Sequence, residues 1–197
     1  MRGKVIDVAG FEAKFRENID PWDYKDSPFE AHKRSVLLRA CGSRYFGRGL
    51  ELACAIGETT RALAPRCRRL LAVDASPTAL AEAIRRNVTC RRVTFRLSQL
   101  PEQTPRGPFD LIVASEILYY LNPNELDVLV RILARAMAPG GRIVILHHLR
   151  NFHDAAVLPS MAQACAFRWM HRRMGLVFLH RTGGFEAAAF EKGFRNG

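Results

Sequence analysis

Two carboxylates and a run of small residues form the part of this sequence best suited to chemistry. Glu51 precedes the small residues Ala53, Ala55 and Gly57, and Asp74 follows Glu51 by 74 − 51 = 23 residues. Small side chains let a backbone pass close to a flat ligand, and glycine tolerates a positive φ. A carboxylate accepts two hydrogen bonds from the vicinal hydroxyls of a ribose, typically about 20 residues after such a loop. The pattern predicts a site for a ligand that contains a nucleoside.

These residues fall at the ends of two predicted strands in an alternating chain. Apolar runs predict strands at 49–53, 69–73, 93–97, 109–114 and 142–147. Helical patterns predict helices between them at 58–64, 77–87 and 125–137, and Pro139-Gly140-Gly141 predicts a turn. Such alternation over short connections predicts a parallel sheet covered on both faces. In doubly wound sheets ligands bind at the carboxyl ends of the strands, where both carboxylates would lie.

The two ends of the chain depart from this alternation. Residues 8–18 and 28–41 predict two N-terminal helices, the second capped by Ser27. A helix over 154–173 then precedes a hairpin whose strands span 176–180 and 187–190. We therefore expect an α/β fold with a doubly wound, mostly parallel, seven-stranded sheet and an antiparallel C-terminal strand. A single domain suffices, with a helical cap over 1–44 and the sheet over 45–197.

The loop after the first strand favours a ligand without a pyrophosphate. A nicotinamide enzyme usually carries G-x-G-x-x-G there, whereas Ala53 and Ala55 occupy two of the glycine positions in this chain. Glu51 disfavours phosphate and suits the amino group of a ligand. A structural alternative stays open, in which residues 53–57 form only a tight turn and Asp74 caps the following helix.

Four blocks of the chain resemble the class I methyltransferases that use S-adenosylmethionine (SAM). Residues 51–57 resemble their first motif, and Asp74, in LLAVDASPTAL, resembles their ribose-binding acid. FDLIVASEILYYL at 109–121 resembles the fourth-strand motif, and LARAMAPGGRIVI at 133–145 resembles the helix, turn and fifth strand that follow. The resemblance implies a Rossmann-like fold, SAM as cofactor, S-adenosylhomocysteine (SAH) as product, and no metal ion.

A narrower resemblance, to the NodS-type methyltransferases, extends to about residue 148. It is carried by FEAKFRENIDPWDYKDSPFEAHKR, LACAIGETT, LAPRCRRLLAVDASPTAL and SEILYYL. Those enzymes N-methylate the free amine of a deacetylated chitooligosaccharide in nodulation-factor synthesis, which implies an oligosaccharide or other small-molecule acceptor. The resemblance also implies that the cap closes over SAM through Trp22, Tyr24 and Arg34. The cofactor-binding residues we expect are Trp22, Arg34, Glu51, Ala53, Cys54, Ala55, Gly57, Asp74, Ala75, Ser76, Ser98, Gln99, Ser115, Glu116 and Ile117.

Glu116, Tyr119 and His147 are the candidate catalytic residues near the acceptor. Only a neutral amine attacks a methyl group, so Glu116, just past the fourth strand, is the candidate proton acceptor; alternatively it fixes the cofactor or caps the next segment. Tyr119 would line the pocket mouth or pack in the core. His147 and His148 end the fifth strand, where an imidazole can act as a base. Adjacent strand residues point to opposite faces, so the two histidines do not predict a metal site.

The composition limits the remaining possibilities. The formal net charge is +11, which favours anionic partners. Five cysteines without a CxxC pair, no signal-like N-terminus and no apolar stretch of about 18 residues predict a cytoplasmic protein. Nucleic acid is not an expected partner, because aromatic residues do not interleave with the basic groups at 66–69 and 85–92. A methyltransferase for another small metabolite and a non-catalytic SAM-binding protein remain alternatives, and the oligomeric state is open.

Overall fold

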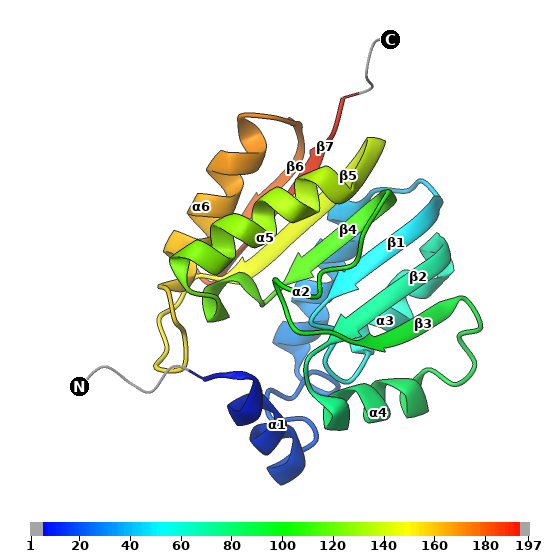
Figure 1. Cartoon of the computed structure of the whole chain (residues 1–197), viewed down its shortest axis with the longest axis vertical. Helices are drawn as coiled ribbons and strands as arrows, with labels where there is room; N and C mark the ends of the chain where they lie inside the picture. The colour runs from blue at the N-terminus through cyan, green and yellow to red at the C-terminus, as the bar shows by residue number, and fades with distance from the viewer. Residues whose placement is uncertain (1–5, 194–197) are drawn as a thin grey trace.

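The computed structural model describes residues 6–193, and these form one mixed sheet (Figure 1). Within them the strand order is β3-β2-β1-β4-β5-β7-β6. The strands are β1 (Phe46–Leu52), β2 (Cys67–Asp74), β3 (Val93–Leu97), β4 (Phe109–Ser115), β5 (Met137–His148), β6 (Gly175–Arg181) and β7 (Phe185–Glu191). Strands β1 to β5 are parallel, and the strand order reverses between β1 and β4. The predicted doubly wound fold is confirmed.

The C-terminal hairpin places β7 inside the sheet and β6 at its edge. Strand β7 runs antiparallel to both β5 and β6, as predicted for the last strand. Its centre consists of three alanines, Ala187, Ala188 and Ala189, all fully buried. Small side chains suit this position because both faces of β7 are covered, whereas edge strand β6 is mostly exposed.

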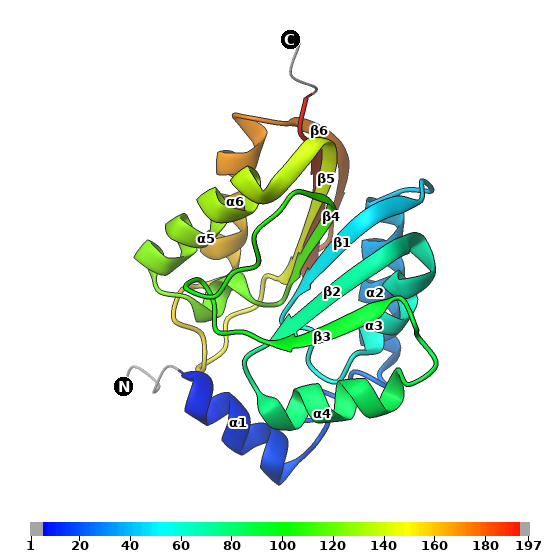
Figure 2. The same ribbon diagram turned by 45° about the vertical axis from the view of Figure 1, so that its right-hand side comes forward.

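Helices cover both faces of the sheet. In the described residues they are α1 (Val8–Glu17), α2 (Pro28–Cys41), α3 (Glu58–Leu63), α4 (Pro77–Arg86), α5 (Pro123–Ala136) and α6 (Pro159–His171). Successive side chains of β4 point to opposite faces of the sheet and pack against different helices. Leu111 and Val113 pack with the cluster that includes α2 and α3, and Ile112 and Ala114 pack with the cluster that includes α5 and α6. Figures 1 and 2 show α5 and α6 on one side, with α2, α3 and α4 on the other.

The segment predicted as a cap divides into two parts. Helix α2 packs on the sheet through Val36, Leu37 and Ala40, so it belongs to a covering layer rather than to a lid. Helix α1 lies beyond the carboxyl ends of the strands (Figure 2). Glu12 of α1 accepts hydrogen bonds from the hydroxyls of Ser76 (2.7 Å) and Thr78 (2.6 Å). The cap is therefore α1 with the segment that follows it.

One predicted turn is wrong. Residues 139–141 lie within the continuous strand β5, which spans Met137–His148. The Gly140 amide donates to the Lys192 carbonyl (2.8 Å), and the Lys192 amide donates to the Gly141 carbonyl (2.9 Å). Gly140 adopts φ +68°, and the register with β4 shifts between Phe109 and Leu111. The glycines therefore produce an irregularity within a strand rather than a turn between elements.

A buried polar chain supports the segment that follows β4. His147 is fully buried; its Nε2 accepts the Leu118 amide (3.2 Å), and its Nδ1 lies 2.7 Å from Gln163 Oε1. Gln163 Nε2 donates to Glu186 (3.1 Å), which Arg181 also contacts. Burial lowers the pKa of His147 to about 4, so at neutral pH its Nδ1–H donates to Gln163. Every link then has one donor and one acceptor.

We predict that Gln163→Leu destabilises the protein strongly. The change keeps the volume but leaves His147 Nδ1–H and a Glu186 oxygen unpaired in the core, at a cost of roughly 1–3 kcal/mol for each group. The free energy of unfolding, measured with urea, should fall by about 2–4 kcal/mol. Ser160→Ala on the exposed side of α6 is the control and should change it by less than about 0.5 kcal/mol. If the urea midpoints of the two variants are equal, the hydrogen bonds from His147 through Gln163 to Glu186 do not contribute to stability.

Candidate active site

The bend after β1 holds three alternate residues in the left-handed region. Ala53 has φ +51°, Ala55 has φ +46° and Gly57 has φ +82°. An alanine in this region costs roughly 1–2 kcal/mol relative to right-handed backbone. The bend is held to β2, since the Cys54 amide donates to the Val73 carbonyl (3.0 Å) and the Ala55 amide to Asp74 Oδ2 (2.8 Å). Strain retained in this way is typical of functional loops.

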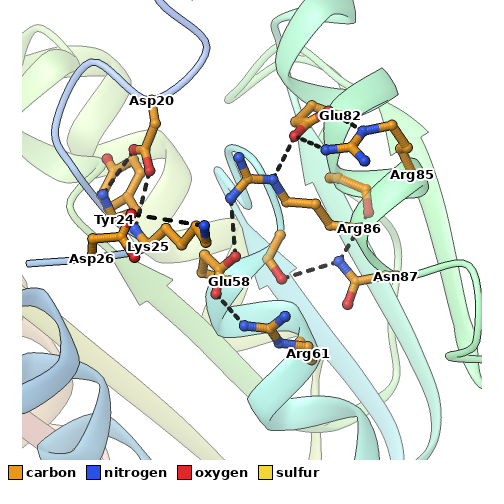
Figure 3. A network of polar contacts seen from close by, with 12 residues as sticks. Asp20, Tyr24, Lys25, Asp26, Glu58, Arg61, Glu82, Arg85, Arg86 and Asn87 are labelled. Carbon is orange, nitrogen blue, oxygen red and sulfur yellow. Dashed lines mark hydrogen bonds and ion pairs between the residues drawn. The ribbon is translucent and has the colours of Figure 1, made fainter.

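A polar network fixes the end of this bend against α4 (Figure 3). Arg86 lies between two carboxylates, with Nε 2.6 Å from Glu82 and Nη1 3.1 Å from Glu58. Asn87 Nδ2 donates to the Gly57 carbonyl (3.1 Å). A Cβ added to Gly57 would lie 2.5 Å from Asn87 Nδ2, so the site requires glycine for space as well as for φ. The start of α3 is thereby locked in place.

A cavity of about 490 Å³ opens at the carboxyl ends of the strands, between the bend and α1. This volume is within the range of small-ligand sites. A smaller pocket of about 50 Å³ shares Tyr24, Ala53, Ala55, Ser115 and Glu116 with it, so the two cavities adjoin. Among the predicted cofactor residues, the larger cavity is also lined by Trp22, Asp74, Ala75, Ser98, Gln99 and Ile117, and the smaller pocket by Arg34, Glu51 and Cys54.

Asp74 ends β2 at the wall of the larger cavity. Its Oδ1 accepts the Ser76 amide (2.9 Å) and its Oδ2 accepts the Ala55 amide (2.8 Å). Burial raises the pKa of this carboxyl, and the backbone hydrogen bonds oppose that effect. Each oxygen keeps a further lone pair. The backbone thus fixes an acceptor pair of the kind a ribose diol requires.

Glu51 and Arg34 both line the smaller pocket. Glu51 Oε2 is buried and has no hydrogen-bond partner among the described residues. Burial raises the pKa of Glu51 to about 8; the nearby Thr60 hydroxyl lowers it only in part, and the charge of Asp74 raises it further. Arg34 Nη1 donates to the Tyr24 carbonyl (3.2 Å). A pocket lined by both an unpartnered carboxyl and a guanidinium fits the ammonium and carboxylate of an amino-acid group.

Glu116 lines both cavities and is surrounded by donors. Its Oε1 lies 2.5 Å from Lys33 Nζ, and its Oε2 accepts the Tyr119 hydroxyl (2.8 Å) and the His148 amide (3.1 Å). Burial alone would raise the pKa of Glu116, but the His148 hydrogen bond and the Lys33 charge hold it well below its usual range. Glu116 is therefore ionised at neutral pH, a condition that makes it a weak base.

Four predicted site residues lie outside the described cavity linings. Gly57 acts through its backbone, and the Ser76 hydroxyl caps α4 by accepting the Ala79 amide (3.0 Å). Tyr119 stands behind Glu116, and its pKa is raised well above the usual value by burial and by the Glu116 charge. The structure does not bring His147 to the cavity, because both of its ring nitrogens bond within the core.

Sequence reasoning missed residues on both N-terminal helices. Glu30 and Lys33 of α2 line the smaller pocket, and Lys33 Nζ lies 2.7 Å from Glu30. Phe11 and Phe15 of α1 line the larger cavity. The spacing of each pair, three and four residues, places it on one helix face and could have indicated them. Local sequence does not indicate which residues they face across the cavity.

Neither a metal-binding cluster nor a membrane-spanning helix is found in the part of the chain that the structure describes. Residues 6–193 contain no cluster of three or more His, Cys, Asp or Glu side chains arranged to hold a metal ion. No helix within the same range is both long and apolar enough to cross a bilayer.

The sheet order, the cavity beside β1 and β4, and the acidic end of β2 define the fold of the class I methyltransferases. The model of the family Nodulation protein S (NodS) matches residues 11–151. The chain belongs to the NodS family. Family membership confirms both predicted resemblances.

Individual relatives support this assignment. The chain is 35% identical over 127 residues to Nodulation protein S of Rhizobium tropici, covering 64% of this chain and 53% of that protein. It is 33% identical over 127 residues to that of Sinorhizobium fredii, covering 64% and 59%. These matches span less than two thirds of either relative. The crystal structure of the N-methyltransferase NodS from Bradyrhizobium japonicum with SAH shares the fold, with a TM-score of 0.78 and 24% identity over 92% of this chain and 97% of that one.

We predict a large effect for Gly57→Ala in the bend and a small one for the reciprocal change Ala55→Gly. Gly57→Ala adds a strained φ and a clash with Asn87, so the free energy of unfolding should fall by about 2–4 kcal/mol. Ala55→Gly relieves strain of about 1 kcal/mol, which offsets the greater freedom of glycine in the unfolded chain. Ala81→Gly on the exposed face of α4 is the control and should cost about 1 kcal/mol. If Ala55→Gly costs as much as Ala81→Gly in urea unfolding, the strain is absent.

We predict that Glu51 makes the protein less stable as pH rises from about 5 to 8. With a folded-state pKa near 8 and an unfolded value of 4.5, the folded state binds the extra proton in this window. Stability then falls by up to about 1.4 kcal/mol per pH unit. Thermal unfolding of Glu51→Gln should lose this slope, while wild type and variant converge below pH 5. A slope that survives the substitution would assign the effect to another group.

Proposed function

We propose that this protein is a SAM-dependent N-methyltransferase whose acceptor is the free amine of a deacetylated chitooligosaccharide. One observation carries the proposal: of two adjoining cavities, the larger is lined by Asp74 and the smaller by Glu51 and Arg34. A nucleoside joined to an amino acid, as in SAM, requires both features together. Membership of the NodS family and the SAH complex of the Bradyrhizobium enzyme support it.

The residues of this chain would divide the cofactor between them. Asp74 accepts hydrogen bonds from the ribose hydroxyls, and Glu51 and Arg34 hold the amino-acid end in the smaller pocket. Trp22 and Tyr24, whose ring centroids lie 5.7 Å apart, form the wall contributed by the cap and exclude water. Bound SAM supplies the methyl group from a sulfonium and leaves as SAH. Little further catalysis is needed if the acceptor nitrogen is aligned.

The acceptor amine would be guided by Glu116. This carboxylate is ionised and lines both cavities, so it attracts the ammonium form of an amine and orients the nitrogen. The amine loses its proton to solvent before attack, since Glu116 is too weakly basic to keep it. Tyr119 then acts by positioning Glu116 through its 2.8 Å hydrogen bond, and His147 by supporting the segment after β4.

We predict that two conservative variants separate cofactor binding from acceptor binding. Asp74→Asn should weaken SAH binding about tenfold or more, the loss of roughly one charged hydrogen bond. Glu116→Gln should raise the KM for chitosan oligomers by a similar factor while SAH affinity changes less than threefold. Calorimetry and a methyl-transfer assay measure the two quantities.

Thermal shift provides the controls for this function. SAM and SAH should raise the melting temperature, and NAD should not. If SAH binds but no amine on chitosan oligomers is methylated, the proposed acceptor is wrong, and other small metabolites or a non-catalytic SAM-binding role replace it. If SAH does not bind, the enzymatic proposal itself fails.

A further inference from the structure

Exposed aliphatic side chains lie on the surface of α6, at its N-cap, and on the adjoining edge strand β6. We name this region the α6–β6 surface and define it by Leu158, Met161, Arg168, Arg172, Leu176 and Leu179. Met161 is 59% exposed, and Leu158, Leu176 and Leu179 are between 36% and 49% exposed. Single exposed aliphatic residues need no explanation, but a group on neighbouring elements marks an interaction site.

The sheet topology explains why β6 is left uncovered. Leu176 and Leu179 are register partners of Phe190 and Ala188 on β7. Those two residues belong to the core cluster beneath α6, where the ring centroids of Phe190 and Phe167 lie 5.3 Å apart. The same face of the sheet therefore continues outward from under α6 to the β6 side chains. Helix α6 covers β5 and β7, and the aliphatic strip on β6 borders its flank.

The charge of this region is entirely positive over a long stretch. Residues 155–185 contain Arg168, Arg172, Arg173 and Arg181 and neither aspartate nor glutamate. Arg181 pairs with Glu186, just outside this stretch, whereas no ion pair of Arg168 or Arg172 occurs within the described residues. Arg168 and Arg172 are exposed and follow Met161 by seven and eleven residues, so the three lie on one side of α6 and its C-terminal end. Like charges so close together favour an anionic partner.

The combination of aliphatic and basic residues selects the partner. Leucine and methionine neither stack on bases nor bond to phosphates, so they would add nothing to nucleic-acid binding. A second copy of the chain would bring arginines against arginines. An anionic bilayer satisfies both features, because aliphatic side chains enter the acyl boundary while arginines contact lipid headgroups. Each arginine near such a surface strengthens binding about fivefold.

We propose that the α6–β6 surface docks the protein reversibly on anionic lipid membranes. The surface begins at Leu158, two residues after Ala156, which lines the larger cavity. Docking therefore brings the rim of the cavity close to the bilayer, so an acceptor held in or on the membrane reaches the site over a short path. The binding itself does not depend on the activity proposed above.

Co-sedimentation of the full chain with lipid vesicles tests this docking. Vesicles of phosphatidylcholine alone are compared with vesicles that also contain phosphatidylglycerol, at low and high salt. Wild type should bind the anionic vesicles at least tenfold more tightly. Arg168→Glu with Arg172→Glu should reduce that binding at least tenfold, and Met161→Asp should reduce it severalfold.

The matched control is Arg68→Glu with Arg69→Glu, an exposed basic pair on β2. Both double variants lower the formal net charge from +11 to 11 − 4 = +7. The control should keep at least half of the vesicle binding, and SAH affinity and melting temperature should be unchanged in all variants. These last measurements separate lost docking from lost folding.

Three outcomes would overturn the proposal. If the control variant on β2 loses as much vesicle binding as the α6 double variant, net charge alone explains the loss. Unchanged binding in Met161→Asp would remove the aliphatic contribution. Tighter binding to a single-stranded oligonucleotide, lost in the α6 double variant, would assign the surface to nucleic acid.

Discussion

The hydrogen bond between the Ala55 amide and the Asp74 carboxylate is the contact on which the site depends. The ladder between β1 and β2 runs to Leu52 and Val73, and this bond joins Ala55, beyond the end of β1, to Asp74, the last residue of β2. To reach Asp74, the chain must adopt left-handed backbone at Ala53 and Ala55. This interaction therefore ties the curvature of the bend to the orientation of the carboxylate, and both line the larger cavity.

Three carboxylates at one edge of the sheet differ in chemistry because their donors differ. Glu51 has an unpartnered buried oxygen and a raised pKa, so at neutral pH a proton or a ligand cation occupies it. Glu116 is equally enclosed, but Lys33, Tyr119 and His148 donate to it and keep it ionised. Asp74 is fixed by two amides. Burial on its own raises the pKa of each of the three, and only at Glu116 do the donors and the Lys33 charge outweigh it.

Local sequence patterns predict the helices and strands. Features that depend on pairing between distant segments cannot be predicted from those patterns. The apolar runs at 93–97 and 109–114 match β3 and β4 closely, because burial imposes alternation on neighbouring residues. The bend and Asp74 were visible because a motif keeps them close in sequence. Gly140 looked like a turn because its partner, Lys192, lies far along the chain.

The same limit applies to the residues around the acceptor side of the site. Strand alternation placed His147 and His148 on opposite faces, but only the sheet register shows that His147 faces the core and His148 faces Glu116. Lys33 meets Glu116 across 83 residues of sequence. Helix α2 resembled a lid because its residues are polar on average, although Val36 and Leu37 are fully buried against the sheet. Composition indicates how much of a helix can be buried, and topology decides which partner buries it.

The cap is coupled to the cavity through its attachments. Glu12 binds Ser76 and Thr78 at the start of α4, directly after Asp74, and Lys14 binds Asp154 (2.5 Å), close to Ala156 at the opposite wall. The hydroxyl and amide donors of Ser76 and Thr78 outweigh burial and lower the pKa of Glu12 to about 2, so the first attachment persists at any ordinary pH. Phe11 and Trp22 complete the wall between them. Because α1 is attached on both sides to segments that line the cavity, a ligand that orders those segments must also stabilise the cap, and a well-ordered cap favours the bound ligand to the same extent.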